Sequence, residues 1–226
     1  MQTHSYEIEI KSLLGSKENA DALVAKMRAK DGTLKTVGSH KQLNHYFVGG
    51  SLQKLHENVS AVVSPADLEK LKDLAGKAKD FSVRTRAADG KVILVVKASV
   101  DDTTSSNGTA RLEWEAKVPA SIEELDNLVL KSGFAYQAKW SRERSEYVYH
   151  NTNVSIDKNA GYGYLAEFEK ITAEESQAPS LKQEIRQLMA ELGVAELAQD
   201  RLARMFDYYN KNWQDYYGTD KIFNIE

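Results

Sequence analysis

The chain contains no cysteine, which excludes disulfide bonds, thiolate metal sites and catalysis by a cysteine nucleophile. Proline is scarce, with 3 residues among 226, and no stretch rich in Pro, Gly or Ser separates two domains. The longest clear apolar run covers only 92–96, far short of the roughly 20 residues of a membrane-spanning helix. The first residues are polar, unlike those of a signal peptide. We therefore expect a single domain over 1–226 that is cytoplasmic and does not bind membranes.

The chain also lacks a strong excess of either charge, since its formal net charge is only -3. A general nucleic-acid scaffold is usually basic, so we expect no general nucleic-acid binding. Hydrophobic residues make up 42% of the chain and charged residues 28%. This balance is typical of a globular protein with a substantial core.

The first strong pattern lies at the N-terminus, where Glu7, Glu9 and Lys11 alternate with Ile8 and Ile10. A period of two predicts a β-strand with one polar and one apolar face. Taken alone, this pattern is explained by a sheet that turns its charged face to water. The pattern recurs along the chain, however, and the recurrence favours a different interpretation.

Later predicted strands carry like charges at alternating positions. Carboxylate pairs occur at Glu113 and Glu115 and at Glu167 and Glu169, and arginine pairs occur at 84/86 and 142/144. Two carboxylates on one face of a strand stand about 6–7 Å apart and repel each other unless a cation lies between them. Paired arginines favour an anion in the same way.

We therefore predict an α+β fold with a closed antiparallel β-barrel, a polar charged lumen, and helices packed on its apolar outside. The barrel motifs lie within 6–171 and the C-terminal helices within 181–217. The predicted strands cover 6–11, 33–37, 42–48, 81–87, 91–100, 110–118, 138–149, 153–157 and 164–171. The predicted helices cover 16–29, 121–131, 181–192 and 195–217, and the segment 51–76 is expected to be mostly helical with a helix start at Ser64.

Two sets of charged residues are assigned to the lumen. The acids are Glu7, Glu9, Glu113, Glu115, Asp157, Glu167 and Glu169. The bases are Lys11, Arg84, Arg86, Lys97, Arg111, Arg142 and Arg144. Carboxylates are suitable ligands for Mg²⁺ or Mn²⁺, and guanidinium groups suit phosphate oxygens.

These motifs, in this order, resemble the CYTH superfamily of triphosphate tunnel metalloenzymes, which includes class IV adenylyl cyclases and thiamine triphosphatases. The opening Glu-x-Glu-x-Lys motif is complete as Glu7, Glu9 and Lys11. Two positions depart from the family pattern. Arg142 and Arg144 replace its usual Lys-x-Arg, with Lys139 just before, and strand parity favours the two arginines as lumen residues. Asn44 stands where many members carry Asp.

The resemblance implies metal-dependent chemistry on a small-molecule triphosphate, such as tripolyphosphate, thiamine triphosphate or a nucleoside triphosphate. Mg²⁺ or Mn²⁺ would be held by the seven acids, the phosphates by the seven bases, and catalysis would depend on Glu7, Glu9, Lys11 and Arg86. We expect a triphosphatase. A class IV adenylyl cyclase and a triphosphate-binding module without turnover are the alternatives, and a homodimer is left open.

Other features carry less information. Tyrosines 208, 209, 216 and 217 with Trp213 could stack on an adenine, but their helical spacing favours packing. The histidines show no ligand spacing and are expected to be surface or strand residues; they are His4, His40, His45, His56 and His150.

Overall fold

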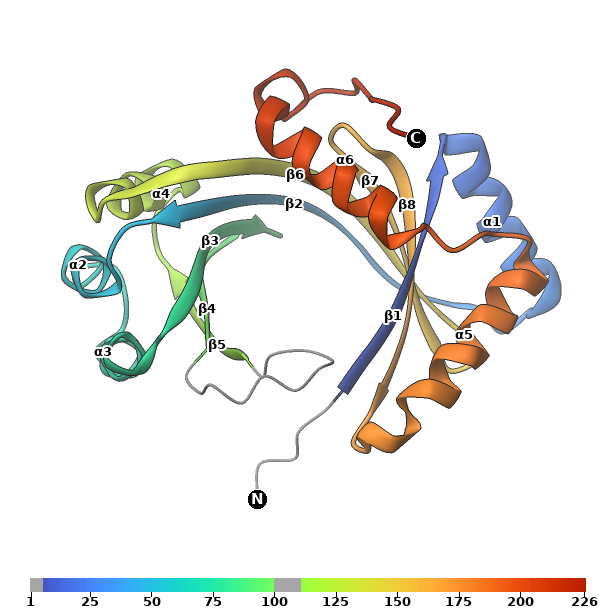
Figure 1. Cartoon of the computed structure of the whole chain (residues 1–226), viewed down its shortest axis with the longest axis horizontal. Coiled ribbons are helices and arrows are strands. Elements are labelled where there is room, and N and C mark those ends of the chain that lie inside the picture. The colour runs from blue at the N-terminus through green and yellow to red at the C-terminus, as the bar shows by residue number, and fades with distance from the viewer. Residues whose placement is uncertain (1–5, 100–110) are drawn as a thin grey trace. The chain divides into compact units, whose positions relative to one another are not determined.

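The computed structural model describes residues 6–99 and 111–226. These form an α+β fold of antiparallel strands and helices (Figure 1). The strands are β1 (Tyr6–Gly15), β2 (Lys35–Gly49), β3 (Asp80–Ala88), β4 (Lys91–Ser99), β5 (Arg111–Val118), β6 (Phe134–Tyr149), β7 (Thr152–Asn159) and β8 (Gly163–Thr172). The helices are α1 (Lys17–Lys30), α2 (Leu52–Asn58), α3 (Pro65–Lys77), α4 (Ile122–Lys131), α5 (Ala178–Leu192) and α6 (Gln199–Asn212). No helix among these residues is both long and apolar enough to cross a membrane.

The hydrogen-bonded strand order is β1-β8-β7-β6-β2-β3-β4-β5. β1 and β5 stand at the two ends of this order, and the described part of the chain forms no ladder between them. The α+β class is thus confirmed, whereas closure of the sheet into a barrel is not. The chain divides into two compact units, one of residues 1–41 and 141–226 and the other of residues 42–140.

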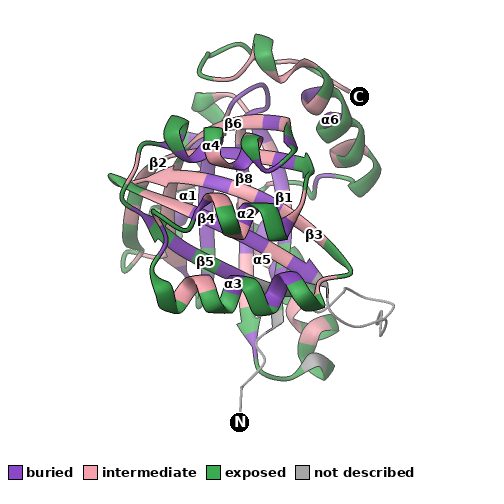
Figure 2. Cartoon of the chain, turned by 90° about the vertical axis from the view of Figure 1, so that its left-hand side faces the viewer, coloured by how far each residue is buried: buried purple, intermediate pink, exposed green. Residues whose placement is uncertain are grey.

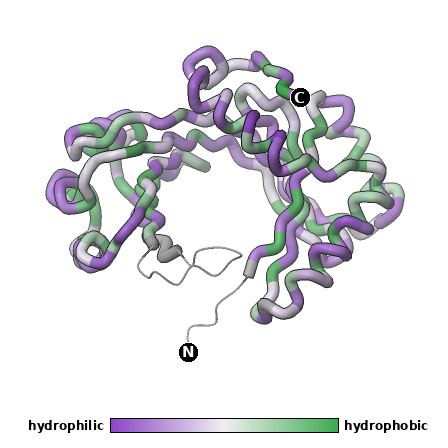
Figure 3. The backbone as a smooth tube through the Cα atoms, in the orientation of Figure 1, coloured by the Kyte–Doolittle hydropathy of each residue, from purple (hydrophilic) through white to green (hydrophobic). Residues whose placement is uncertain are grey.

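In the first unit, β1, β8, β7 and part of β6 form an antiparallel sheet with two unlike faces. Hydrophilic and hydrophobic residues alternate along these strands (Figure 3). The apolar face places Ile10, Val154 and Phe168 against Leu23 of α1 and Ile185 of α5, and all five are buried. Burying each such side chain stabilises the fold by roughly 1.5–3 kcal/mol. The two helices lie beside each other along β1 and β8 (Figure 1), so the charged side chains are left on the opposite face.

The outer edge of β1 is partly covered by the segment between α5 and α6. The backbone N–H of Leu197 donates to the carbonyl of Lys11 over 2.7 Å. This carbonyl therefore points away from β8, which places Lys11 and Glu9 at the non-hydrogen-bonded positions of the β1–β8 ladder. Side chains at such positions approach each other most closely across a ladder.

In the second unit, β3, β4 and β5 with part of β2 pack against α2, α3 and α4. Val83 and Val96 of the sheet meet Leu55, Leu71 and Leu125 of the helices in a buried cluster. Figure 2 shows the strands as largely buried behind α2 and α3, whose outer faces are exposed. A capping box begins α4, because Ser121 and Glu124 exchange hydrogen bonds.

Two segment predictions, for β2 and for the last helix, were wrong in detail. The two short strands expected over 33–37 and 42–48 are one strand, β2, which runs through both units. The segment expected to be mostly helical over 51–76 is two helices, and the second begins at the Ser64 helix start that the sequence predicts. The last helix ends at Asn212 rather than near residue 217 and continues as a short 3-10 turn.

Candidate functional site

The polar face of the first unit carries its carboxylates at one end of the strands. Glu9 of β1 lies directly opposite Glu169 of β8, which in turn lies opposite Asn153 of β7. Burial and the charges of Glu7, Glu9 and Glu167 together raise the pKa of Glu169. The crowding of like charges predicted from the sequence is therefore present at this end of the face.

The next row across the sheet alternates in charge. Lys11 lies opposite Glu167, and Glu167 lies opposite Ser155, whose hydroxyl is 3.3 Å from Glu167 Oε2. Lys11 Nζ forms ion pairs with both Glu9 and Glu167. Burial lowers the pKa of Lys11, but the two carboxylates outweigh burial and raise it above its ordinary value. Lys11 thus joins the acidic end of the face to its basic end.

The basic end is built around a buried carboxylate. Asp157, only 1% exposed, lies opposite Arg144 and accepts from its Nε and Nη2 over 2.7 Å each. Arg142 Nη1 approaches the same carboxylate at 3.4 Å, and Arg144 Nη2 also donates to Glu167 over 2.6 Å. Burial would lower the pKa of Arg144, but its hydrogen bonds and ion pairs with Asp157 and Glu167 outweigh burial and raise the pKa above its ordinary value. Asp157 is therefore engaged by arginine side chains, and its predicted role as a metal ligand stays a prediction.

A cavity of about 200 Å³ opens on this face. Its lining includes four predicted site residues, Glu9, Arg144, Glu167 and Glu169. It also includes polar residues that the sequence analysis did not single out, namely Glu146, Asn153 and Ser155. They occupy the same face because of the pairing of β6, β7 and β8, which no local pattern reveals.

Glu146 connects this face to β2. Its Oε2 is 2.9 Å from Nε2 of His40. The imidazole ring of His40 lies over Gly38, where an added Cβ would come within 3.0 Å of it. His40 is a partly exposed strand residue, as expected, and it also pairs with a carboxylate that lines the cavity.

Whether the carboxylates suit a metal ion can be judged from their surroundings. Among the residues that the structure describes, no three carboxylate or histidine side chains are already grouped closely enough to hold one. Glu9 and Glu167 are instead paired with cations of the protein. The pKa of Glu169, however, is raised first by burial and then by the charges of Glu7, Glu9 and Glu167, so negative charge gathers at this end of the face. Oxygen ligands with excess negative charge fit Mg²⁺ or Mn²⁺.

The second unit carries the predicted Arg-x-Arg pair on β3. Arg84 Nη1 donates to the hydroxyl of Tyr46 over 3.2 Å, and Arg86 Nε donates to Oδ1 of Asn44 over 3.1 Å. Arg86 Nη1 also approaches Oε1 of Glu115 at 3.7 Å. The alternation of β2, β3 and β5 brings these side chains to one face of the sheet.

The remaining predicted residues of this unit are placed less fully. Lys97 is half-buried on β4 and lies opposite Glu113 of β5. The side chains of Arg111 and Glu113 lie outside the described residues. That the charged faces of the two units enclose one lumen stays a prediction.

A buried carboxylate that the sequence analysis missed lies behind the arginine pair. Asp126 of α4 accepts hydrogen bonds from Thr85 and Tyr136 and is bonded to His45. Lys139 Nζ is 3.7 Å from the same carboxylate and 4.2 Å from the centre of the Tyr136 ring. Lys139 therefore contacts this network, whereas Arg142 and Arg144 lie with Asp157 on the polar face of the first unit.

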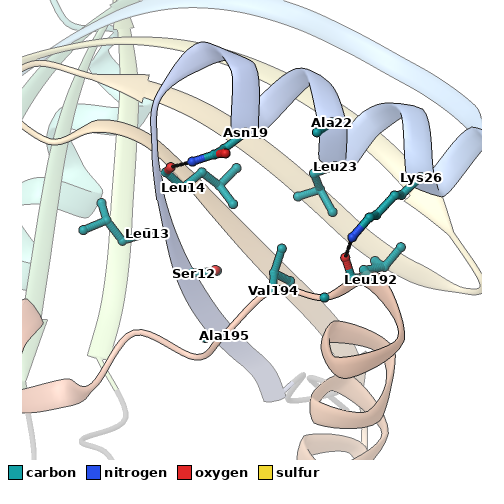
Figure 4. Close-up of a pocket in the computed structure, with 11 residues that line it drawn as sticks. Ser12, Leu13, Leu14, Asn19, Ala22, Leu23, Lys26, Leu192, Val194 and Ala195 are labelled. Atoms are coloured by element: carbon teal, nitrogen blue, oxygen red, sulfur yellow. Dashed lines mark hydrogen bonds between the residues drawn. The ribbon is translucent and has the colours of Figure 1, made fainter.

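A second hollow, of about 280 Å³, lies between α1, β1 and residues 192–195 (Figure 4). Lys26 Nζ donates to the carbonyl of Leu192 and Asn19 Nδ2 to that of Leu14. Its lining contains no carboxylate and no arginine. The charged face is therefore the stronger candidate site.

The fold and this face define a class of protein, an α+β protein whose antiparallel strands present segregated carboxylates and basic groups on one face. The CYTH domain family matches residues 5–202, so the chain belongs to that family. The resemblance inferred from the sequence motifs is thereby confirmed.

Solved structures share the fold at low sequence identity. The PH1012 protein of Pyrococcus horikoshii is 18% identical, with a TM-score of 0.55 over 84% of this chain and 92% of that one. The PH1819 protein of the same organism is 20% identical, with a TM-score of 0.52 over 86% and 94%. A Vibrio parahaemolyticus protein called a "putative adenylate cyclase" is 12% identical, with a TM-score of 0.54 over 89% and 98%. No curated protein matches this chain.

Proposed function

We propose that this protein is a divalent-metal-dependent hydrolase of a triphosphate substrate. The observation that carries the proposal is the separation of charge on one sheet face, with Glu7, Glu9 and Glu169 at one end and Arg142 and Arg144 at the other. A triphosphate with a bound cation presents the complementary charges, since the cation prefers carboxylates and the phosphates prefer guanidinium groups.

The basic residues bind and orient the phosphate chain. Lys11 and Arg144 are already held by carboxylates, so their positions are fixed before the substrate arrives. Such preorganisation lowers the cost of aligning the phosphates with the attacking water. Arg84, Arg86 and Lys97 of the second unit supply further phosphate ligands, with Arg111 and Arg142.

The carboxylates at the acidic end hold the metal. Glu7, Glu9, Glu167 and Glu169 are its proposed ligands, supported by Glu113, Glu115 and Asp157. Mg²⁺ or Mn²⁺ bound there would neutralise phosphate charge and lower the pKa of a coordinated water. Glu167 also contacts Lys11 and Arg144, and therefore ties the position of the phosphate ligands to that of the metal ligands.

Hydrolysis is favoured over cyclisation by the packing of the C-terminal aromatic residues. Tyr209 is completely buried, and its ring packs with those of Tyr162, Tyr216 and Phe223. Tyr208 packs on Phe223 with ring centres 4.9 Å apart. These rings pack on one another, as their helical spacing predicts, and a cyclase would need a platform for adenine in addition. The Vibrio neighbour supports a cyclase only as an alternative, because its similarity to this chain concerns the fold.

The proposal is tested by incubating the protein with tripolyphosphate, thiamine triphosphate and ATP, each with Mg²⁺ or Mn²⁺. We expect orthophosphate release that EDTA abolishes. Glu9→Ala and Arg86→Ala should each remove this activity while the circular dichroism spectrum is retained. Cyclic AMP formed faster than orthophosphate would establish the cyclase, and tight binding without any product would establish a binding module.

A further inference from the structure

Asp126 is a carboxylate buried on the helix-covered side of the second unit, only 2% exposed. Its Oδ1 accepts from the Thr85 hydroxyl over 2.6 Å. Its Oδ2 accepts from the Tyr136 hydroxyl over 2.7 Å and lies 2.7 Å from Nδ1 of His45. A buried carboxylate is tolerated only where such partners satisfy its oxygens.

The charge of this carboxylate is maintained by those partners. Burial alone would raise the pKa of Asp126, but the hydrogen bonds from His45, Thr85 and Tyr136 outweigh it and lower the pKa. Asp126 is therefore ionised at neutral pH, and hydrogen bonds to an ionised acceptor are stronger than those between neutral groups.

Thr85 gives this network a connection to the proposed phosphate ligands. It stands between Arg84 and Arg86 on β3, and neighbouring side chains of a strand point to opposite faces. The strand is thus held by Asp126 on one face at the position where it presents the two arginines on the other.

The neighbouring strand repeats the arrangement. His45 is the register partner of Thr85 and also binds Asp126. The residues on either side of it, Asn44 and Tyr46, point to the other face and accept from Arg86 and Arg84. One carboxylate therefore holds both the strand that carries the arginines and the strand that carries their neutral acceptors.

We propose that Asp126 is a positioning residue for triphosphate binding, which acts through Thr85 and His45 to fix the backbone beneath Arg84 and Arg86. This inference rests on the proposed function, because it takes the two arginines to be phosphate ligands. Two guanidinium groups on one strand face repel each other. Their spacing is then kept by Asn44 and Tyr46, whose own positions depend on the anchored backbone.

Thr85 offers a matched pair of variants for the test. Thr85→Val removes the hydroxyl but keeps the branched shape that suits a strand, whereas Thr85→Ser keeps the hydroxyl. Ser132→Ala is the control, because Ser132 is completely buried in the same unit and its hydroxyl bonds Asn58 and the Leu128 carbonyl instead. The affinity for tripolyphosphate is measured by calorimetry in EDTA, together with the melting temperature.

We expect Thr85→Val to weaken tripolyphosphate binding about tenfold, the factor that corresponds to the loss of one ordinary buried hydrogen bond. The affinity of Thr85→Ser for tripolyphosphate should lie within about twofold of the wild-type affinity. Ser132→Ala should lower the melting temperature without changing the affinity. Wild-type affinity in Thr85→Val would overturn the proposal, and so would equal weakening in Thr85→Val and Ser132→Ala.

A second measurement separates this inference from the proposed function. The Nε–H signals of Arg84 and Arg86 in ¹⁵N NMR spectra report the hydrogen bonds of the arginines without any ligand. We expect Thr85→Val, but not Ser132→Ala, to shift or broaden the Arg86 signal. If wild type releases no orthophosphate from any of the three triphosphates with Mg²⁺ or Mn²⁺, the proposed function fails. The NMR comparison then decides the positioning role alone, and unchanged signals in Thr85→Val would overturn it.

Discussion

Glu9 and Glu169 are register partners on β1 and β8, at a non-hydrogen-bonded position where side chains of the two strands come closest. Like charges placed directly opposite each other destabilise a sheet. Lys11 compensates Glu9 through an ion pair, whereas the pKa of Glu169 remains raised by burial, Glu7 and Glu9. The metal-free fold therefore contains a local excess of negative charge.

Glu169→Gln should stabilise the metal-free protein and weaken its binding of Mn²⁺. Removing one of the opposed charges should raise the free energy of unfolding by roughly 0.5 kcal/mol at pH 8, the size of an unfavourable cross-strand pair. Because the folded-state pKa of Glu169 is raised, its destabilising effect is present at high pH and is lost as pH falls through that pKa. Urea unfolding in EDTA measures the first effect and Mn²⁺ titration the second.

Glu191→Gln is the control for this substitution, because Glu191 is an exposed carboxylate on α5 of the same unit. Glu191→Gln should change neither the free energy of unfolding nor the free energy of Mn²⁺ binding by more than about a few tenths of a kcal/mol. A Glu169→Gln protein that is less stable than wild type in EDTA would contradict the interpretation of this end of the face as a cation site.

Asp157→Asn should destabilise the protein strongly, by about 3 kcal/mol, because it removes the buried carboxylate that Arg142 and Arg144 share, although Arg144 keeps its ion pair with Glu167. Urea unfolding monitored by fluorescence measures the change. The exposed Lys158–Asp220 pair of the same unit provides the control. Asp220→Asn should cost under about 1 kcal/mol, as exposed pairs do, and equal costs for the two variants would show that the Asp157 network is not a structural centre.

Glu167 should make the stability of the fold depend on pH in the acid range. Burial would raise its pKa, but Lys11, Arg144 and Arg142 outweigh burial and lower it below 4.5. An acid with a lowered folded-state pKa stabilises the fold fully above its unfolded pKa, and this contribution is lost as pH falls through the folded pKa. Wild type should therefore exceed Glu167→Gln in unfolding free energy at pH 7, and the difference should shrink as pH falls below about 4.3, the ordinary pKa of Glu. A constant difference between pH 7 and pH 3 would contradict this assignment.

Local patterns in the sequence were sufficient to predict which charged residues share a face. The parity of Glu7, Glu9 and Lys11 follows from the period of a strand alone, and the ladder with β8 confirms it. Asp126 could not be predicted in the same way, because it is one of three acidic residues on an amphipathic helix and no local pattern sets it apart. Its partners come from β2, β3 and β6, and only the tertiary fold brings them together.

The extent of β2 and the closure of the sheet depend on long-range pairing in the same way. Gly38 interrupts the alternation of β2 and favours two short strands in a sequence-based prediction, yet the strand continues through it. Closure would require β1 to pair with β5, the two strands at the ends of the order. No local pattern in either strand determines its edge partner, which is why the barrel remains the least supported part of the sequence prediction.

Gly38 and His40 should be energetically coupled. An added Cβ at residue 38 would lie 3.0 Å from Cε1 of His40, so Gly38→Ala must displace the ring that pairs with Glu146. Without the His40 ring, Gly38→Ala should raise the free energy of unfolding, because replacing Gly by Ala at a compatible position stabilises a protein by about 0.4–1 kcal/mol. We expect Gly38→Ala to be neutral or destabilising in wild type and stabilising in a His40→Ala background. A double-mutant cycle from urea unfolding measures the coupling, which should reach about 0.5–1.5 kcal/mol. Additive effects of the two substitutions would show that the ring of His40 does not occupy the space above Gly38 in solution.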